Sequence, residues 1–310
     1  MPSLTTHLAD IELRNPIIAA SGTCGYVEEL PDVLDPHWIG AIVTKSITRE
    51  PREGNPPWRI IDLPHAPAML NAIGLANVGL DRFIREKLPA AAQAGSVIIG
   101  SIAGGSVGDY AAVAEAIEQS GVLPAVELNV SCPNTADGLQ FGEHPGKLTE
   151  LLKAIRPVLK RTKMIVKLSP NVGDIVAMAN AAIDAGADVL TLINTVSAMA
   201  IDVQTRKSRL SRGSGGLSGP AIHPIAVRMV SEVYRGVTKS AGIPIIGLGG
   251  VMNWEDAAEL ILAGATAVGV GTALFVDMTM PRRLVNGLEK WVAKQGCTSI
   301  GELIGQVALP

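Results

Sequence analysis

The chain has 310 residues, of which 47% are hydrophobic and 18% charged, and its net charge is −3. These proportions are typical of a soluble globular protein with a large core, and the weak net charge gives no sign of a nucleic-acid or membrane partner. No stretch reaches the ~18 consecutive apolar residues of a membrane-spanning helix, and residues 1–16 lack the pattern of a secretion signal. We therefore expect a cytoplasmic protein.

Three widely spaced cysteines, Cys24, Cys132 and Cys297, do not form a disulfide framework. They also fall short of the four thiolate ligands of a conventional iron–sulfur cluster. We expect no metal site in this chain and structural roles for Cys24 and Cys297.

The sequence contains eight short β-rich runs that are apolar on both faces, as strands of a parallel sheet covered by helices must be. The runs are Pro16–Ala20, Ala41–Lys45, Val97–Gly100, Ala125–Val130, Met164–Leu168, Val189–Ile193, Pro244–Leu248 and Ala267–Val270. Several of the intervening segments have apolar residues at every third or fourth position, which is typical of amphipathic helices. These segments are residues 109–121, 147–161, 171–186, 223–237 and 253–264. We predict a (β/α)₈ barrel that forms a single domain over residues 1–310.

An open doubly wound sheet is the alternative architecture, and its crevice would usually carry the dinucleotide fingerprint G-x-G-x-x-G. Neither GLGGVM at residues 247–252 nor GVGTAL at residues 269–274 completes that fingerprint. We therefore expect no nicotinamide site in this chain.

Polar residues follow the predicted strands at their carboxyl ends, where barrels of this kind carry their chemistry. The fourth run ends in ELNVSCPNT, residues 127–135, in which Cys132 lies between Ser131 and Pro133. A lone cytosolic cysteine is usually a small buried hydrophobe. Here, however, the proline stops the strand, and the loop after it is long, polar and contains glycine, as lids do. This context favours a functional Cys132.

Glycines follow the seventh and eighth runs at Gly249, Gly250 and Gly271, and Thr272 comes next. Backbone N–H groups at these two places of a barrel commonly bind phosphate. The glycines could instead only permit tight turns, but their presence at both places favours a phosphate site.

Lys45 and Lys167 lie at the ends of apolar strands, where an unpaired ammonium would be costly. We therefore expect an anionic or electron-rich partner for each of them. The alternatives are a lysine that extends to solvent and, for Lys167, a lysine that forms a Schiff base.

Asn71, Asn129 and Asn194 each offer two donors and an acceptor, which suits a flat heterocycle with alternating carbonyl and N–H groups. Asn71 lies in the connection from Ile47 to Lys87, which is too long for a simple barrel loop and is expected to fold over the barrel mouth. A second long excursion, Val203–Pro220, is too rich in glycine for a helix and is expected to close the site from the other side.

Taken together, these residues resemble the class 1 dihydroorotate dehydrogenases, which are flavin enzymes of pyrimidine synthesis. The likeness extends over essentially the whole chain, and ELNVSCPNT is its most specific segment. It is supported by NPIIAASGTCGY, VTKSIT, NAIGLANVG, MIVKLSP, LINTV, GGLSGPAI, GLGG and GVGT. The SGTCGY and GNPPWRI segments are most similar to the NAD-linked type of the class, type 1B.

The resemblance implies a role for each matching residue. Cys132 would be the base that takes a proton from C5 of dihydroorotate while hydride leaves C6 for N5 of FMN. The substrate would be surrounded by Lys45, Asn71, Ala72, Ile73, Gly74, Leu75, Asn129, Asn194 and Thr195. FMN would be contacted by Ser21, Lys45, Ser46, Ser101, Asn129, Lys167, Ile193 and Gly219, and its phosphate end by Gly249, Gly250, Gly271 and Thr272. The chain departs from the family at Ser101, where asparagine is common, and the shorter hydroxyl is expected to replace that contact poorly.

The resemblance also implies partners. In type 1B enzymes, electrons leave FMN through a second subunit that carries FAD and a [2Fe–2S] cluster, and the subunits form a heterotetramer around a catalytic dimer. Three other functions remain open from the residues. They are a dihydropyrimidine dehydrogenase subunit, whose substrate lacks the carboxylate, a Schiff-base lyase that uses Lys167, and a non-catalytic flavin or phosphate binder.

Overall fold

A closed barrel of eight parallel strands forms the centre of the protein. The structure is a computed structural model and describes residues 1–27, 34–63, 66–91, 93–131 and 141–309. The strands follow one another around the barrel in chain order. They are β3 (Ile17–Ala19), β4 (Ala41–Val43), β7 (Val97–Ile102), β8 (Ala125–Asn129), β9 (Lys163–Lys167), β10 (Val189–Leu192), β15 (Ile245–Leu248) and β16 (Ala267–Val270). Each predicted run contains one of them, and the predicted (β/α)₈ barrel is confirmed.

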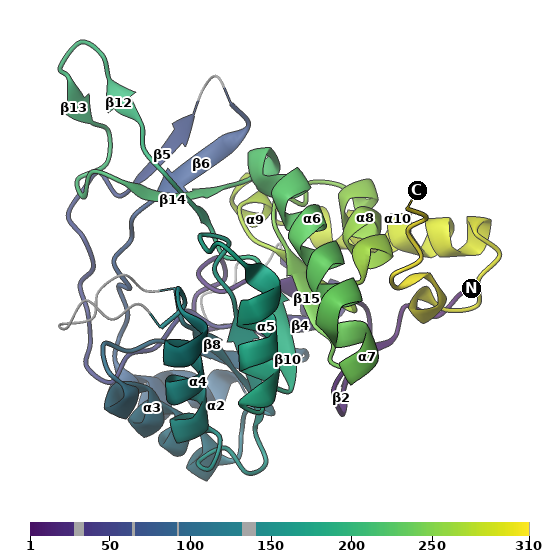
Figure 1. Ribbon diagram of the computed structural model, residues 1–310, viewed down its shortest axis with the longest axis horizontal. Coiled ribbons are helices and arrows are strands. Elements are labelled where there is room, and N and C mark those ends of the chain that lie inside the picture. Colours follow the sequence, from purple (N-terminus) through teal and green to yellow (C-terminus); the bar gives the residue numbers. More distant parts are fainter. Residues whose placement is uncertain (28–33, 64–65, 92, 132–140, 310) are drawn as a thin grey trace.

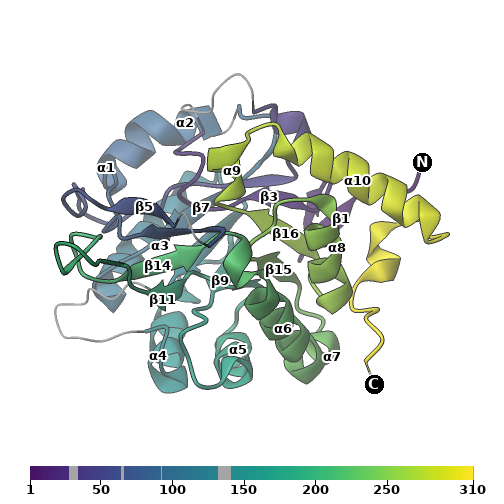
Figure 2. The same cartoon turned by 90° about the horizontal axis from the view of Figure 1, so that it is seen from above.

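Helices form a ring outside the barrel, as Figure 2 shows from above. They are α1 (Leu80–Arg82), α2 (Leu88–Ala91), α3 (Val107–Ser120), α4 (Pro145–Ile155), α5 (Ile175–Asp184), α6 (His223–Val233), α7 (Lys239–Ala241), α8 (Trp254–Ala263), α9 (Ala273–Val276) and α10 (Met280–Lys294). All five predicted helical segments contain a helix. The segment 147–161 is helical only as far as Ile155, because Pro157 lacks the N–H group that would continue the ladder. No helix in these described ranges is both long and apolar enough to cross a bilayer.

The interior of the barrel changes from apolar to polar along its axis. At the amino-terminal end, the hairpin of β1 (Thr6–Leu8) and β2 (Ile11–Leu13) packs Leu8 and Leu13 into one buried cluster with Ile99 and Ile165 of the barrel strands. Side chains alternate along a strand, so the residue two positions further on faces the same way. Ile99 is followed in this way by Ser101, and Ile165 by Lys167. The polar layer therefore lies at the carboxyl ends of the strands.

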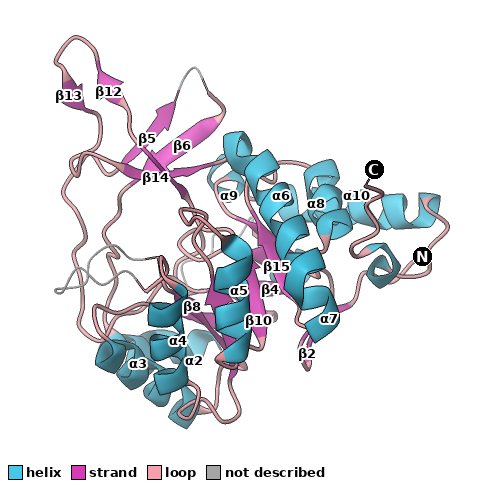
Figure 3. Ribbon diagram, in the orientation of Figure 1, coloured by secondary structure: helices cyan, strands magenta, loops and turns pink. Residues whose placement is uncertain are grey.

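A four-stranded antiparallel sheet, which we call the lid sheet, lies beyond the carboxyl ends of the barrel strands (Figures 1 and 3). Its strands are β11 (Val196–Ala198), β14 (Gly215–Ser218), β6 (Ala68–Asn71) and β5 (Ile60–Leu63), in that order. The small hairpin of β12 (Ile201–Asp202) and β13 (Lys207–Ser208) projects beside it.

The lid sheet joins the two long excursions of the sequence. β6 belongs to the connection after β4, and β14 to the excursion after β10, yet Asn71 is opposite Gly216 and Leu70 is opposite Leu217. The two excursions were expected to cover the mouth from opposite sides. Instead, they cover it as one hydrogen-bonded sheet.

Candidate active site

A cavity of about 770 Å³ lies between the polar end of the barrel and the lid sheet. This volume suits a cofactor together with a small substrate. Of the residues assigned to substrate or cofactor from the sequence, all but Ser101 and Cys132 line it. They are Ser21, Lys45, Ser46, Asn71, Ala72, Ile73, Gly74, Leu75, Asn129, Lys167, Ile193, Asn194, Thr195, Gly219, Gly249, Gly250, Gly271 and Thr272. Cys132 lies outside the described residues, whereas its neighbour Ser131 lines the cavity.

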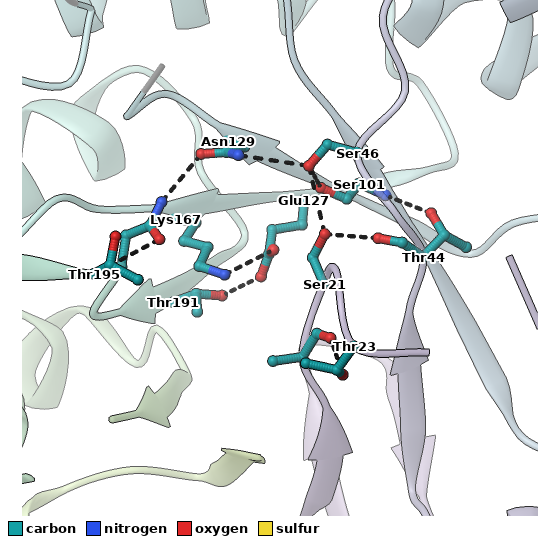
Figure 4. Close-up of polar contacts among 12 residues, drawn as sticks. Ser21, Thr23, Thr44, Ser46, Ser101, Glu127, Asn129, Lys167, Thr191 and Thr195 are labelled. Carbon is teal, nitrogen blue, oxygen red and sulfur yellow. Dashed lines mark hydrogen bonds and ion pairs between the residues drawn. The ribbon is translucent and has the colours of Figure 1, made fainter. Parts of the chain in front are cut away.

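A chain of side-chain hydrogen bonds crosses the polar end of the barrel (Figure 4). Ser21 Oγ donates to the Thr44 carbonyl at 2.7 Å and lies 3.4 Å from Ser46 Oγ. Further along, Asn129 Nδ2 donates to Ser46 Oγ at 3.5 Å, and Asn194 Nδ2 donates to Asn129 Oδ1 at 3.2 Å. The network connects polar side chains contributed by separate strands and orients them before any ligand binds.

Ser101 belongs to this network but does not line the cavity. It is fully buried, its hydroxyl lies 2.8 Å from Ser46 Oγ, and its N–H donates to Thr44 Oγ1 at 3.0 Å. Its hydroxyl contacts Ser46, which does line the cavity. Its predicted contact with a cofactor stays a prediction.

Lys167 has a partner that the sequence did not reveal. Its Nζ lies 3.7 Å from Oε1 of Glu127, and both side chains are buried. Thr191 Oγ1 donates to the other oxygen, Glu127 Oε2, at 2.9 Å. The strand pairing explains why these three side chains meet. Lys167 of β9 is opposite Thr191 of β10 on one side and Asn129 of β8 on the other. Glu127 lies two residues before Asn129 and therefore faces the same way.

Lys45 is the cavity lysine without such a partner. It lies just after β4, and within the described residues no carboxylate pairs with it. Burial lowers the pKa of Lys45, and the positive charge of Arg59 lowers that pKa further. An anionic ligand in the cavity would relieve both costs, since it would supply the missing counter-charge.

The glycine turns after β15 and β16 form the other end of the cavity. Among the residues described, the backbone N–H groups of Gly249, Gly250, Gly271 and Thr272 have no hydrogen-bond acceptor. Gly250 has φ +69, and a Cβ built there would lie 2.8 Å from the Gly219 carbonyl oxygen. Donors that remain unpaired at a cavity wall are well suited to a phosphate group.

The sequence matches the family model described as dihydroorotate dehydrogenase over residues 3–292. The chain belongs to the dihydroorotate dehydrogenase family. It is similar to a protein of Geotalea uraniireducens named "Dihydroorotate dehydrogenase B (NAD(+)), catalytic subunit", with 46% identity over 305 residues that cover 98% of each chain. A protein of the same name from Bacteroides thetaiotaomicron is 43% identical over 306 residues, which cover 98% of this chain and 99% of the relative. The family predicted from the motifs is confirmed.

Some residues of this dihydroorotate dehydrogenase cavity were not predicted from the sequence. They include Asn55, Asn171, Arg212 and Ser218. Asn171 Nδ2 donates to the Thr195 carbonyl at 3.1 Å, and its Oδ1 accepts the Ser197 N–H at 2.8 Å, so it fixes the segment that leads into β11. Asn171 lies four residues after the end of β9, beyond the polar residues that directly follow the strand. Asn55 and Arg212 lie in the two excursions. The path of these excursions cannot be predicted from the periodicity of apolar residues in the sequence.

Proposed function

We propose that this chain is the catalytic subunit of an NAD-linked dihydroorotate dehydrogenase, which oxidises dihydroorotate to orotate in pyrimidine nucleotide synthesis. Relatives that match nearly the whole chain are named for this activity. The structural observation that carries the proposal is Lys45, a largely buried cation that lines the cavity and has no carboxylate partner in the described part of the chain. A substrate with a carboxylate group supplies that partner.

The residues of the cavity fit FMN as the cofactor. The unpaired N–H groups at Gly249, Gly250 and Gly271 suit its phosphate, while Asn129 and Lys167 suit the polar edges of its ring. When bound, FMN supplies the acceptor for the hydride that leaves C6 of dihydroorotate.

The chain's own side chains then have distinct tasks. Lys45 holds the substrate carboxylate, and Asn71, Asn129 and Asn194 orient the ring through its carbonyl and N–H groups. We assign Cys132 as the base that takes the proton from C5, which is a role for a thiolate held close to the substrate. Replacing Cys132 with serine is expected to leave dihydroorotate binding intact and slow its oxidation at neutral pH. A variant with an unchanged rate and pH profile contradicts the assignment.

The activity is tested by recording the visible spectrum of the purified chain and adding dihydroorotate without oxygen. Bleaching of a yellow flavin band is the expected result. A yellow protein that is bleached by dihydrouracil but not by dihydroorotate would instead identify a substrate without the carboxylate. A colourless protein that takes up no FMN would overturn the proposal.

Lys45→Met is the matched test of the carboxylate contact, with Lys160→Met as its control, because Lys160 is exposed and does not line the cavity. We expect Lys45→Met to raise the dihydroorotate concentration needed for bleaching at least tenfold, since a charged hydrogen bond contributes about 1.5–3 kcal/mol. The Lys160 variant should behave as the wild type does.

We infer that the electrons pass to NAD through a second subunit that carries FAD and a [2Fe–2S] cluster, in a heterotetramer built around two catalytic subunits. The isolated chain should therefore be reduced by dihydroorotate yet form no NADH, and adding the second subunit should restore NADH formation. NADH made by the chain alone would refute this inference. The cytoplasmic location expected from the sequence stays a prediction.

A further inference from the structure

Lys167, which lines the cavity, forms an ion pair with Glu127, which does not (Figure 4). The Nζ to Oε1 distance is 3.7 Å, whereas an N–H···O hydrogen bond spans about 2.7–3.2 Å. In the described residues, Lys167 Nζ has no closer acceptor. The carboxylate therefore balances the charge of the ammonium without using its hydrogen-bond donors, which stay available to a ligand.

The carboxylate is fixed from its other side. Its Oε2 accepts the Thr191 hydroxyl at 2.9 Å, while Oε1 is buried and accepts no hydrogen bond from a described residue. A buried carboxylate oxygen without a donor is costly. The nearby charge of Lys167 offsets this cost, so the two side chains depend on each other.

Lys167 lines the cavity and Glu127 does not. Glu127 is 2% exposed and lies one layer deeper in the barrel, two residues before Asn129. It therefore acts on a bound ligand through Lys167.

We propose that Glu127 is a positioning residue that holds Lys167 Nζ at the cavity floor and limits how strongly its charge stabilises reduced FMN. This inference rests on the proposed function, since it concerns the cofactor assigned there. A lone ammonium beside the flavin ring favours the reduced, electron-rich form. A carboxylate behind the ammonium offsets part of that preference. Lys167 thus makes the flavin easier to reduce, and Glu127 limits that effect so that the reduced flavin can still pass its electrons on.

Glu127→Gln removes the negative charge and keeps the size of the side chain and an acceptor for Thr191. We expect it to shift the equilibrium between oxidised and reduced FMN about tenfold toward the reduced form, which for two electrons is a rise of ~30 mV in midpoint potential. Lys167→Met is expected to shift the equilibrium at least tenfold in the opposite direction. Glu150→Gln is the control, because Glu150 makes an exposed pair with Lys147 on α4, and it should leave the potential unchanged.

The double variant Glu127→Gln/Lys167→Met tests whether Glu127 acts through Lys167. If it does, adding Glu127→Gln to Lys167→Met changes the flavin equilibrium less than twofold. A Glu127→Gln potential equal to or below that of the wild type refutes the inference. A full tenfold shift in the Lys167→Met background also refutes it, because Glu127 would then act directly.

Failure of this inference is distinguishable from failure of the proposed function. A wild-type protein that binds FMN but is not bleached by dihydroorotate contradicts the proposed function, while the potentials of the variants still decide the role of Glu127. If no FMN binds, the role of Glu127 is decided by urea unfolding without cofactor. The proteins compared are the wild type, the two single variants and the double variant. If Glu127 and Lys167 interact, the unfolding constant of the double variant should differ at least fivefold from the value expected by combining the two single variants. Additive effects would refute the interaction.

Discussion

Gly250→Ala tests directly whether the glycine turn after β15 binds phosphate, and Gly242→Ala is its matched control. Both glycines have left-handed backbone, with φ +69 at Gly250 and φ +66 at Gly242. A Cβ at Gly250 would lie 2.8 Å from both the Gly219 carbonyl oxygen and His223 Cβ, whereas a Cβ at Gly242 has no heavy atom within 4 Å. Both variants therefore carry about 1–2 kcal/mol of backbone strain, but only Gly250→Ala must also move its backbone.

That movement displaces the N–H groups of the turn from a bound phosphate. A hydrogen bond to a charged group contributes about 1.5–3 kcal/mol, and 1.4 kcal/mol corresponds to a factor of ten in affinity. We expect Gly250→Ala to weaken FMN binding about 10- to 100-fold and Gly242→Ala to change it less than twofold. The affinity is measured by titrating apoprotein with FMN and following the quenching of flavin fluorescence.

Urea unfolding of both variants shows whether each remains folded under the assay conditions. A folded Gly250→Ala protein that binds FMN as tightly as the wild type would show that this turn does not hold the phosphate. Equal losses in the two variants would attribute the effect to backbone strain alone.

Three further predictions concern charged residues. Partial burial raises the pKa of Glu118, but hydrogen bonds from Thr162 and Arg161 outweigh it and lower that pKa to about 2. The stabilisation is therefore complete above the ordinary pKa of 4.5 and is lost as the pH falls toward 2. In urea melts, Glu118→Gln should lower the free energy of unfolding at pH 7 by about 2 kcal/mol. It should also flatten the decline of that free energy between pH 4.5 and 2. An unchanged decline would contradict the assignment. Because burial lowers the pKa of Lys45, orotate should bind more weakly as the pH rises through that lowered value, and titrations of Lys45→Met should lose this dependence. Arg212 lies exposed on the cavity wall without a carboxylate partner among the described residues, so Arg212→Gln should reduce kcat/KM for dihydroorotate about threefold at low salt and hardly at all in 0.5 M salt. A loss that persists at high salt would indicate direct contact instead of steering.

The barrel could be predicted from the sequence because its strands carry a strong local signal. Runs such as Val189–Ile193 are apolar on both faces, and amphipathic segments such as residues 253–264 end at glycine, which the structure uses to end α8 at Gly264. The unpredicted helix α10 follows the last strand, beyond the strand and helix pattern from which the barrel was inferred.

The pairing of residues across the barrel could be predicted less well. Lys167 was expected to need an anionic partner, but nothing local identifies Glu127, which is 40 residues earlier in the chain. That partner follows from register, because a shift of one residue along β8 would turn Glu127 to the other face. Ser101 illustrates the same limit. The sequence places it at a strand end, and only the packing shows that its hydroxyl contacts Ser46 instead of lining the cavity.

The lid sheet restricts how this protein can be altered. On most barrels of this architecture, each connection after a strand is a separate module, and one can be exchanged without the others. Here β6 and β14 share their backbone hydrogen bonds, although they follow different barrel strands. A chimaera that receives the Ile47–Lys87 connection of a relative must therefore receive the matching Val203–Pro220 excursion as well. A variant that changes only one of the two connections is expected to disrupt the backbone hydrogen bonds between β6 and β14.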